Sequence, residues 1–314
     1  MNAQQKARLG GRAVSSFSTA VAPYHFSTIE QALNDALAAY GVNGLVIHAD
    51  GNIHRFDSID KPKGNRNGWY ACPSLEVAVF GFWHTGEQHT VSLTGEHDPA
   101  AAAEARLAAQ RAREQRDAER SAKQTKTAEQ ARRWWATAGA ADPNHSYLAK
   151  KRLAPHGLRQ RGSMLLVPLH VNGELVNLER IFPDGDKRPL AGGRVKGVAS
   201  LIGILAGAER VLIAEGWATA AALHEATGAP VVVARNADNL ETVARRLRQR
   251  LPDGVSITIA ADDDRFTDNN PGVTKAQLAA LAIGAKVLMP TFCKDCRKCT
   301  DFADVALCRQ GVTV

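Results

Sequence analysis

The C-terminal third of the chain alternates short apolar runs with stretches that have helical character. The runs are continuous rather than alternating, which is typical of strands buried on both faces. Helical stretches of 11 or 12 residues lie between them. This order predicts a parallel sheet with right-handed crossovers and helices on both faces. The expected strands are 210–214, 230–234, 255–261 and 286–289, and the expected helices are 217–227, 239–250 and 273–283.

The N-terminal region has a different pattern, with short apolar runs interrupted by turn residues. A helix is expected over about residues 28–40, and Asp50-Gly51 between two apolar runs predicts a hairpin. Together these predict a small α+β module. Its aromatic residues lie among basic ones, so they either form a core, the favoured interpretation, or stack on bases. They are Trp69, Tyr70, Phe82 and Trp83.

Between these two regions, residues 98–138 predict one long helix. The stretch has no glycine before Gly139 and no proline after Pro99, and it is rich in Ala, Arg, Glu and Gln. Between Glu104 and Arg133, nine basic against five acidic residues give it a positive charge, and no heptad pattern is sustained. A solvated spacer between domains is the favoured interpretation, and contact with phosphates is the alternative. Further along, Asn172-Gly173 predicts a second hairpin.

Composition limits the classes of protein that fit. The chain has 314 residues, 45% of them hydrophobic and 23% charged, which suits more than one soluble domain. No run is apolar enough to span a bilayer, and the first residues do not resemble a secretory signal. The net charge of +7 suits a polyanionic partner such as nucleic acid. The five cysteines do not suggest a secreted disulfide framework, so we expect a cytoplasmic location.

Acidic residues follow two of the predicted strands. Glu215 comes directly after the strand at 210–214, and Asp262 and Asp264 come after the strand at 255–261. Functional groups gather at the carboxyl edge of a parallel sheet, and alternate residues of an extended segment point the same way. Carboxylate oxygens are ligands that Mg²⁺ prefers. We therefore expect these three acids to bind a divalent cation, although strand-end acids are also common as caps and surface charges.

A cluster of cysteines near the C-terminus predicts either a metal site or free thiols. Three of them follow the pattern C-x2-C-x2-C, and a fourth follows after eight intervening residues. Such spacing can hold a structural Zn²⁺ or, less often, an iron–sulfur cluster. The residues are Cys293, Cys296, Cys299 and Cys308.

An ordered set of motifs resembles the TOPRIM-domain DNA primases of plasmids and phages. The resemblance runs from about residue 25 to residue 311 and is more specific than any single motif. In the C-terminal region it rests on 214–217 (AEGW), 261–265 (ADDDR), 270–276 (NPGVTKA) and 300–306 (TDFADVA). Upstream it rests on 145–151, 165–169, 187–197, 68–70 and 81–87.

The resemblance implies synthesis of RNA primers on single-stranded DNA for a mobile element. Glu215 would be a catalytic glutamate, and Asp262 and Asp264 would bind Mg²⁺ or Mn²⁺. The partners would be a DNA template, ribonucleoside triphosphates and a helicase in trans, because the chain has no P-loop motif. Basic residues would contact template or nucleotide, namely Arg180, Lys187, Arg188, Arg194, Lys196 and Lys275.

This chain departs from the family pattern in two respects. Ala303 stands where relatives often have asparagine, and Cys72 is the only cysteine before residue 90, so the zinc module of replicative primases has no counterpart there. Two other functions remain open. One is a TOPRIM nuclease or nicking enzyme that uses the same acids, and the other is a non-catalytic factor that binds or loads single-stranded DNA.

The expected fold class is α/β, with a TOPRIM catalytic core, Rossmann-like in its parallel sheet, joined by a long helix to a small N-terminal α+β domain. The expected divisions are a flexible N-terminus at 1–23, the α+β module at 24–96, with nucleic-acid binding as an alternative role, the basic linker helix at 97–139, a basic α+β segment at 140–205 and the TOPRIM domain with its cysteine cluster at 206–314.

Overall fold

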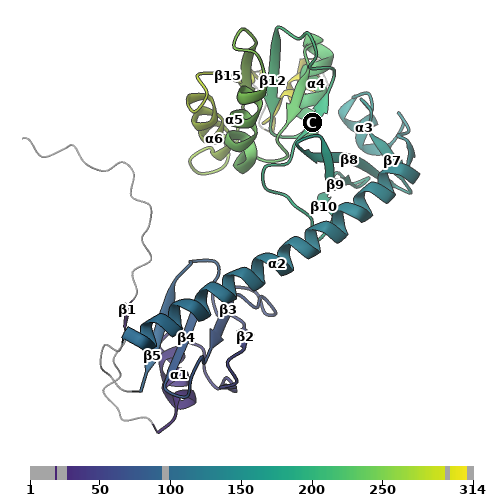
Figure 1. Ribbon diagram of the computed structural model, residues 1–314. Helices are drawn as coiled ribbons and strands as arrows, with labels where there is room; N and C mark the ends of the chain where they lie inside the picture. Colours follow the sequence, from purple (N-terminus) through teal and green to yellow (C-terminus); the bar gives the residue numbers. More distant parts are fainter. Residues whose placement is uncertain (1–17, 20–26, 94–98, 294–297, 310–314) are drawn as a thin grey trace, which may run out of the picture. The chain divides into compact units, whose positions relative to one another are not determined.

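The computed structural model describes residues 18–19, 27–93, 99–293 and 298–309 (Figure 1). The chain divides into two compact units, Met1–Glu119 and Arg120–Val314. Each is described by itself. No helix in the described part of the chain is both long enough and apolar enough to cross a membrane.

The N-terminal unit is a five-stranded sheet with a helix packed on it. The strand order is β1-β5-β4-β3-β2, with β1 parallel to β5 and the other neighbours antiparallel. Its helix α1 buries Leu33 and Leu37 against Tyr70 and Phe80 of the sheet. The elements are β1 (Ser18–Thr19), α1 (Ile29–Ala38), β2 (Ile53–Phe56), β3 (Gly68–Ala71), β4 (Val77–Phe82) and β5 (Gln88–Ser92).

The prediction of a hairpin at Asp50-Gly51 is wrong. Residues 45–49 form no strand, Val46 is exposed, and β2 pairs only with β3 in the described sheet. The Asp50 carboxylate instead accepts hydrogen bonds from the Asn52 amide at 2.9 Å and the His54 ring at 2.8 Å. This local bonding satisfies the turn without a second strand.

Helix α2 (Pro99–Thr137) confirms the long helix that the composition predicts. Within the N-terminal unit, small residues at helical spacing pack against β3 and β4: Ala105, Ala109 and Ala112 contact Trp69, Val77 and Val79. Within the C-terminal unit, Ala131 packs on Leu166, Leu178 and Leu190. The two ends of the helix are therefore parts of two cores, and charged residues occupy its other faces along its length.

The C-terminal unit begins with an antiparallel sheet in the order β10-β9-β8-β7-β6. The Asn172-Gly173 turn joins β8 to β9, and both residues have positive φ (56° and 88°), which confirms the predicted hairpin. The elements are β6 (Gly139–Ala140), α3 (Ser146–Lys151), β7 (Arg159–Arg161), β8 (Met164–Val171), β9 (Glu174–Ile181) and β10 (Lys187–Pro189).

The second sheet of this unit confirms the α/β fold expected from the apolar runs. Its order is β11-β13-β12-β14-β15, and all neighbours are parallel except the edge strand β11. The elements are β11 (Ser200–Ile202), β12 (Arg210–Ala214), α4 (Trp217–Thr227), β13 (Val231–Val233), η1 (Ala237–Asn239), α5 (Leu240–Arg250), β14 (Ser256–Ala260), α6 (Pro271–Leu281), β15 (Lys286–Leu288) and α7 (Phe302–Arg309).

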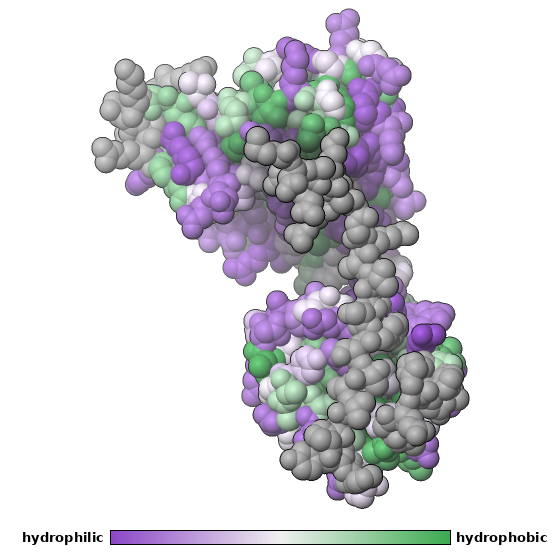
Figure 2. All heavy atoms as spheres, turned by 90° about the vertical axis from the view of Figure 1, so that its left-hand side faces the viewer, coloured by the Kyte–Doolittle hydropathy of each residue, from purple (hydrophilic) through white to green (hydrophobic). Residues whose placement is uncertain are grey.

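Both faces of this sheet are buried, which explains why its strands are continuously apolar. In β12, Val211 and Ile213 point into a core with α5 and α6, whereas Leu212 and Ala214 point into a core with α4. Figure 1 shows α5 and α6 on one side of β12 and α4 on the other. The α4 core also contains Leu148, Leu165 and Ile181, so it joins the two sheets of the unit. Much of the visible surface is hydrophilic (Figure 2).

Candidate active site

The three acids predicted as the site follow neighbouring strands. Strands β12 and β14 pair in register, with Ala214 opposite Ala260. Glu215 comes directly after β12, and Asp262 and Asp264 come just after β14. The two chain segments therefore leave the sheet side by side at its carboxyl edge, where a parallel α/β sheet exposes its functional groups.

These carboxylates raise each other's pKa. Burial and then the charges of Glu215 and Asp301 raise the pKa of Asp262 to about 8, although the Thr219 hydroxyl donates a hydrogen bond to it at 3.1 Å. Burial and then Asp264 likewise raise the pKa of Glu215. Anions that are partly buried and repel each other are stabilised by a cation.

One carboxylate oxygen of Glu215 also indicates that a cation binds here. The Oε2 atom of Glu215 is buried and has no hydrogen-bond partner among the described residues. A buried carboxylate oxygen in this state costs free energy unless something else binds it. The donor set, which consists of carboxylate oxygens, is the kind that Mg²⁺ and Mn²⁺ take. The residues therefore fit a divalent cation.

The acids do not form a closed cage in this structure. Among the described residues, no group of three His, Cys, Asp or Glu side chains is close enough to hold a metal ion. The Asp264 carboxylate accepts a hydrogen bond from the Gly272 amide at 2.9 Å, at the start of α6. A Cβ atom on Gly272 would come within 2.4 Å of the Asp262 carbonyl oxygen, so only glycine allows this approach.

The middle acid of the triplet has a separate role. The Asp263 carboxylate accepts a hydrogen bond from the Asn270 side chain at 2.7 Å, and its amide donates to the Thr300 carbonyl at 2.7 Å. It fixes the loop that leads into α6. Asp263 therefore has a structural role next to the site, and its substitution is a control for substitutions of the three acids.

Two further acids lie at the site, and sequence reasoning gave them no role. Asp301 raises the pKa of Asp262, and its own pKa is raised by burial, more than Lys151 lowers it. The Nζ atom of Lys151 lies 2.7 Å from Asp304 and 3.9 Å from Asp301. This ion pair joins α3 to the start of α7. The motif at 300–306 marked these acids, but nothing in the sequence paired them with Lys151.

One predicted basic residue reaches the acids. The Nζ atom of Lys187 lies 3.9 Å from the position that a Cβ atom would take on Gly216, the residue after Glu215, and 5.7 Å from the Tyr147 ring. Burial alone would lower the pKa of Lys187, but Tyr147, Glu179 and Asp301 outweigh it and raise the pKa. Lys187 is thus held in its charged form beside the acids.

The other predicted basic residues form three groups. Lys275 pairs with Asp238 at 3.2 Å, and Asp238 in turn raises the pKa of Glu215. Arg180 and Arg188 flank the Phe182 ring, with guanidinium carbons 5.6 and 6.0 Å from its centre. The third group is a loop: the Arg194 side chain donates to the Lys196 carbonyl at 3.1 Å.

The cysteine cluster is only partly visible. The sulfur atoms of Cys293 and Cys308 are 3.0 Å apart, and Cys299 is buried. Cys296 lies outside the described residues. A zinc site at these cysteines stays a prediction.

Most of the aromatic side chains of the N-terminal unit form its core. Trp69, Tyr70 and Phe82 are buried, and the Arg116 guanidinium lies 4.7 Å above the Trp83 ring. The first three therefore cannot stack on bases. Lys61 and Lys63, on the loop before β3, are exposed, but the module at 24–96 has more acidic than basic residues.

Comparisons with known proteins find a domain that contains the three acids. The family model "Toprim domain" matches residues 210–311, which include all three acids. A DNA primase TraC from Escherichia coli is 33% identical over 264 residues, which cover 77% of this chain and 24% of the relative. A second DNA primase TraC from Escherichia coli is 37% identical over 141 residues, 42% of this chain and 10% of that relative.

Solved structures give weaker likenesses. The primase fragment of the bacteriophage T7 primase-helicase protein has a TM-score of 0.39 at 16% identity, and the match covers 55% of this chain and 74% of that one. The DnaG catalytic core has a TM-score of 0.31 at 14% identity, and the match covers 49% of this chain and 54% of that one. The chain spans about a quarter of the length of the first TraC relative. It carries a Toprim domain at residues 210–311 and is homologous to DNA primases, as its motifs predict.

Proposed function

We propose that this chain synthesises short RNA primers on single-stranded DNA by Mg²⁺-dependent nucleotidyl transfer. The observation that carries the proposal is the set of coupled acids, with the partnerless Glu215 oxygen, at the carboxyl edge of a Toprim sheet. Homology to DNA primases supports the choice of reaction. The proposal also includes a single-stranded DNA template, ribonucleoside triphosphates as substrates and a helicase in trans. The primers would serve the replication of a mobile element.

Each residue has a role in this reaction. Glu215, Asp262 and Asp264 would hold Mg²⁺ or Mn²⁺, which would neutralise phosphate charge and polarise the α-phosphate. Thr219 orients the Asp262 carboxylate through its hydrogen bond, and the Gly272 amide orients Asp264. Lys187, kept charged by its neighbours, would bind a triphosphate oxygen.

The remaining basic residues would guide the nucleic acid. Lys275 lies near the acids through Asp238, which suits contact with the incoming nucleotide. Exposed guanidinium and ammonium groups bind phosphates without reading sequence, and this suits a template that varies. The groups concerned are the exposed Arg188 and Lys196 and the half-buried Arg180 and Arg194, together with the lysines of the N-terminal module at 24–96.

Primer synthesis tests the proposal directly. The chain is incubated with single-stranded DNA, Mg²⁺ and radiolabelled ribonucleotides, and the products are separated on a gel. We expect oligoribonucleotides from the wild type and a loss of at least about 1000-fold in Glu215→Gln and Asp262→Asn, since these would lose metal-bound charge in the transition state. Asp263→Asn, whose side chain binds Asn270, should stay within about threefold of the wild type.

The other outcomes identify the rival functions. Cut template without primers would make the chain a nuclease that uses the same acids. DNA binding alone, unchanged by Mg²⁺, would make it a loading factor. Full activity in both Glu215→Gln and Asp262→Asn would exclude these acids as the centre.

A further inference from the structure

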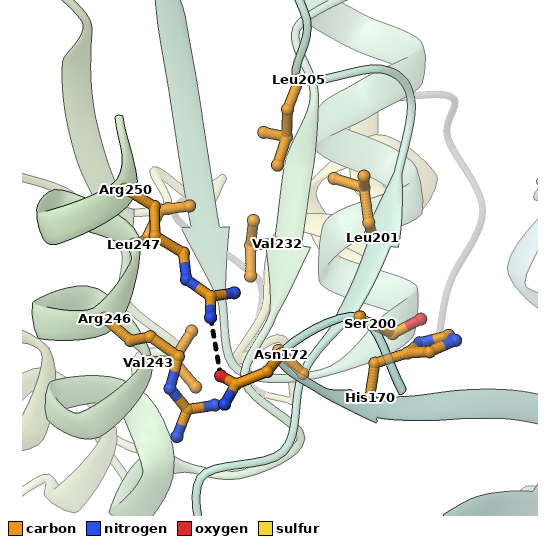
Figure 3. Close-up of a pocket in the computed structure, with 12 residues that line it drawn as sticks. His170, Asn172, Ser200, Leu201, Leu205, Val232, Val243, Arg246, Leu247 and Arg250 are labelled. Carbon is orange, nitrogen blue, oxygen red and sulfur yellow. Dashed lines mark hydrogen bonds between the residues drawn. The ribbon is translucent and has the colours of Figure 1, made fainter. Parts of the chain in front are cut away.

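The C-terminal unit has a cavity beside β11, the edge strand of its mostly parallel sheet. The Asn172-Gly173 turn, β11 and α5 surround it (Figure 3), and its volume is about 390 Å³. It contains none of the acids of the candidate active site. Cavities of this size accommodate a ligand group or a few side chains of a partner.

The walls of this cavity are aliphatic. They come from β11, the loop after it, β13 and α5, and they include no Phe, Tyr or Trp ring. Leu201, on β11, is 42% exposed, which is unusual for a leucine inside a sheet. The aliphatic walls therefore suit an apolar occupant, and His170 supplies the one aromatic ring among the lining residues. The aliphatic residues are Leu201, Leu205, Val232, Val243 and Leu247.

The rim of the cavity is positively charged. Arg246 and Arg250 lie one turn apart on α5 and both reach towards the turn after β8 (Figure 3). Arg246 donates to the Gly197 carbonyl at 2.6 Å, and Arg250 donates to the Asn172 side-chain oxygen at 2.7 Å. Burial and then the charges of Arg194 and Arg250 lower the pKa of Arg246. The guanidinium groups of Arg194, Arg246 and Arg250 are therefore close enough to repel one another.

Among the described residues, neither Arg246 nor Arg250 is part of an ion pair. Arg246 donates to a backbone carbonyl and Arg250 to an amide oxygen. A guanidinium has five donors in a rigid fork, so each arginine has donors left for a carboxylate. The neighbouring Arg245, in contrast, is paired with Glu241 at 2.8 Å and lies outside the cavity.

We propose that this cavity binds an acidic, apolar peptide segment of a partner protein. An apolar side chain of the segment fills the aliphatic interior, and a carboxylate beside it binds Arg246 and Arg250. β11 is the edge strand of its sheet, so its outer side offers backbone groups to an extended segment. A nucleic-acid strand fits less well, because its phosphates would occupy the rim and leave the aliphatic walls without an apolar partner.

A peptide-binding experiment tests this assignment. The fluorescein-labelled peptide Glu-Asp-Leu-Leu-Asp-Glu is titrated with the whole chain, and fluorescence anisotropy is measured. Two matched peptides separate the contributions: Gln-Asn-Leu-Leu-Asn-Gln has no charge, and Glu-Asp-Gly-Gly-Asp-Glu has no apolar side chain. We expect saturable binding of the first peptide and binding at least about tenfold weaker for each of the others.

Substitutions locate the binding site. Arg250→Gln removes a charge from the rim, and Leu201→Asp puts a carboxylate at the exposed wall, so each should weaken binding about tenfold. Arg245→Gln, one residue before Arg246 but outside the cavity, should leave binding unchanged. Thermal melting followed by circular dichroism checks that each variant is folded.

Three results would overturn the proposal. They are equal binding of all three peptides, unchanged binding in both Arg250→Gln and Leu201→Asp, and displacement of the peptide by oligo(dT) together with weaker DNA binding in Arg250→Gln. The last result would make the cavity a phosphate site. The outcome is independent of primer synthesis, because Glu215→Gln should bind the peptide as the wild type does.

Discussion

The two units of this chain use carboxylates in opposite ways. In the N-terminal unit, Asp57 accepts amide hydrogen bonds from Gly64 at 2.5 Å and Arg66 at 2.8 Å, and these bonds lower its pKa. Hydrogen bonds from His54 and Asn52 lower the pKa of Asp50 in the same way. In the C-terminal unit, burial and repulsion raise the pKa of Glu215, Asp262 and Asp301.

This contrast separates structural acids from functional ones. A carboxylate whose pKa is lowered stabilises the fold in its charged form, since the native contacts favour the charge. A set of carboxylates whose pKa values are raised destabilises the charged fold and needs a cation or a proton. Groups with shifted pKa values cluster at functional sites, so this contrast supports the role proposed for the C-terminal acids.

The largest effect on stability should come from Lys151, which forms an ion pair with Asp304 and lies near Asp301. Lys151→Met removes this ion-pair partner, so the free energy of unfolding should fall by about 2–3 kcal/mol. The measurement is urea denaturation followed by fluorescence. Lys150→Met, which removes an exposed lysine one position earlier, should change it by less than about 0.5 kcal/mol. Equal effects of the two substitutions would contradict the ion-pair account.

The pH dependence should differ in sign between the two kinds of acid. Asp262 keeps its proton in the folded state up to a pKa of about 8, whereas the unfolded chain loses it near pH 4. The unfolded state therefore binds fewer protons between these values, and stability falls as pH rises from about 4 to about 8. Mg²⁺ should reverse the fall.

Thermal melting at pH 5 and pH 8, with and without Mg²⁺, checks this prediction. Asp262→Asn should reduce both the pH dependence and the effect of Mg²⁺ on the melting temperature. The same Mg²⁺ effect in Asp262→Asn and in the wild type would show that the ion binds elsewhere.

The smallest effect is expected at a structural acid of the N-terminal unit. Because its pKa is lowered, Asp57 stabilises the fold above about pH 4, and the stabilisation is lost as pH falls through its folded pKa. Asp57→Ala should lower the melting temperature at pH 7, by less than Lys151→Met does, and should have little effect at pH 2. A larger loss at pH 2 than at pH 7 would contradict this role.

Local patterns in the sequence predicted much of the fold. Continuous apolar runs indicated strands buried on both faces, and Asn172-Gly173 indicated a turn in which both residues have positive φ. Asp50-Gly51 gave the same signal and was misread, because the Asp50 side chain can satisfy a turn by itself. The dipeptide alone does not show whether the segment before it forms a strand that pairs with the segment after it.

The site was predictable only in so far as it depends on strand ends. Glu215 and the acids after β14 could be located because adjacent parallel strands bring their carboxyl ends together. The contact between Lys151 and Asp304 joins residues far apart in the chain, and no local pattern encodes it. The cavity beside α5 depends in the same way on Asn172 meeting Arg250.

The most direct test of the account measures metal binding at the acids. Isothermal titration with Mn²⁺ is carried out on the wild type, Glu215→Gln, Asp262→Asn and Asp263→Asn. The account predicts binding to the wild type and Asp263→Asn, and affinity at least about tenfold lower in the other two variants. Equal affinity in Asp262→Asn and the wild type would contradict it.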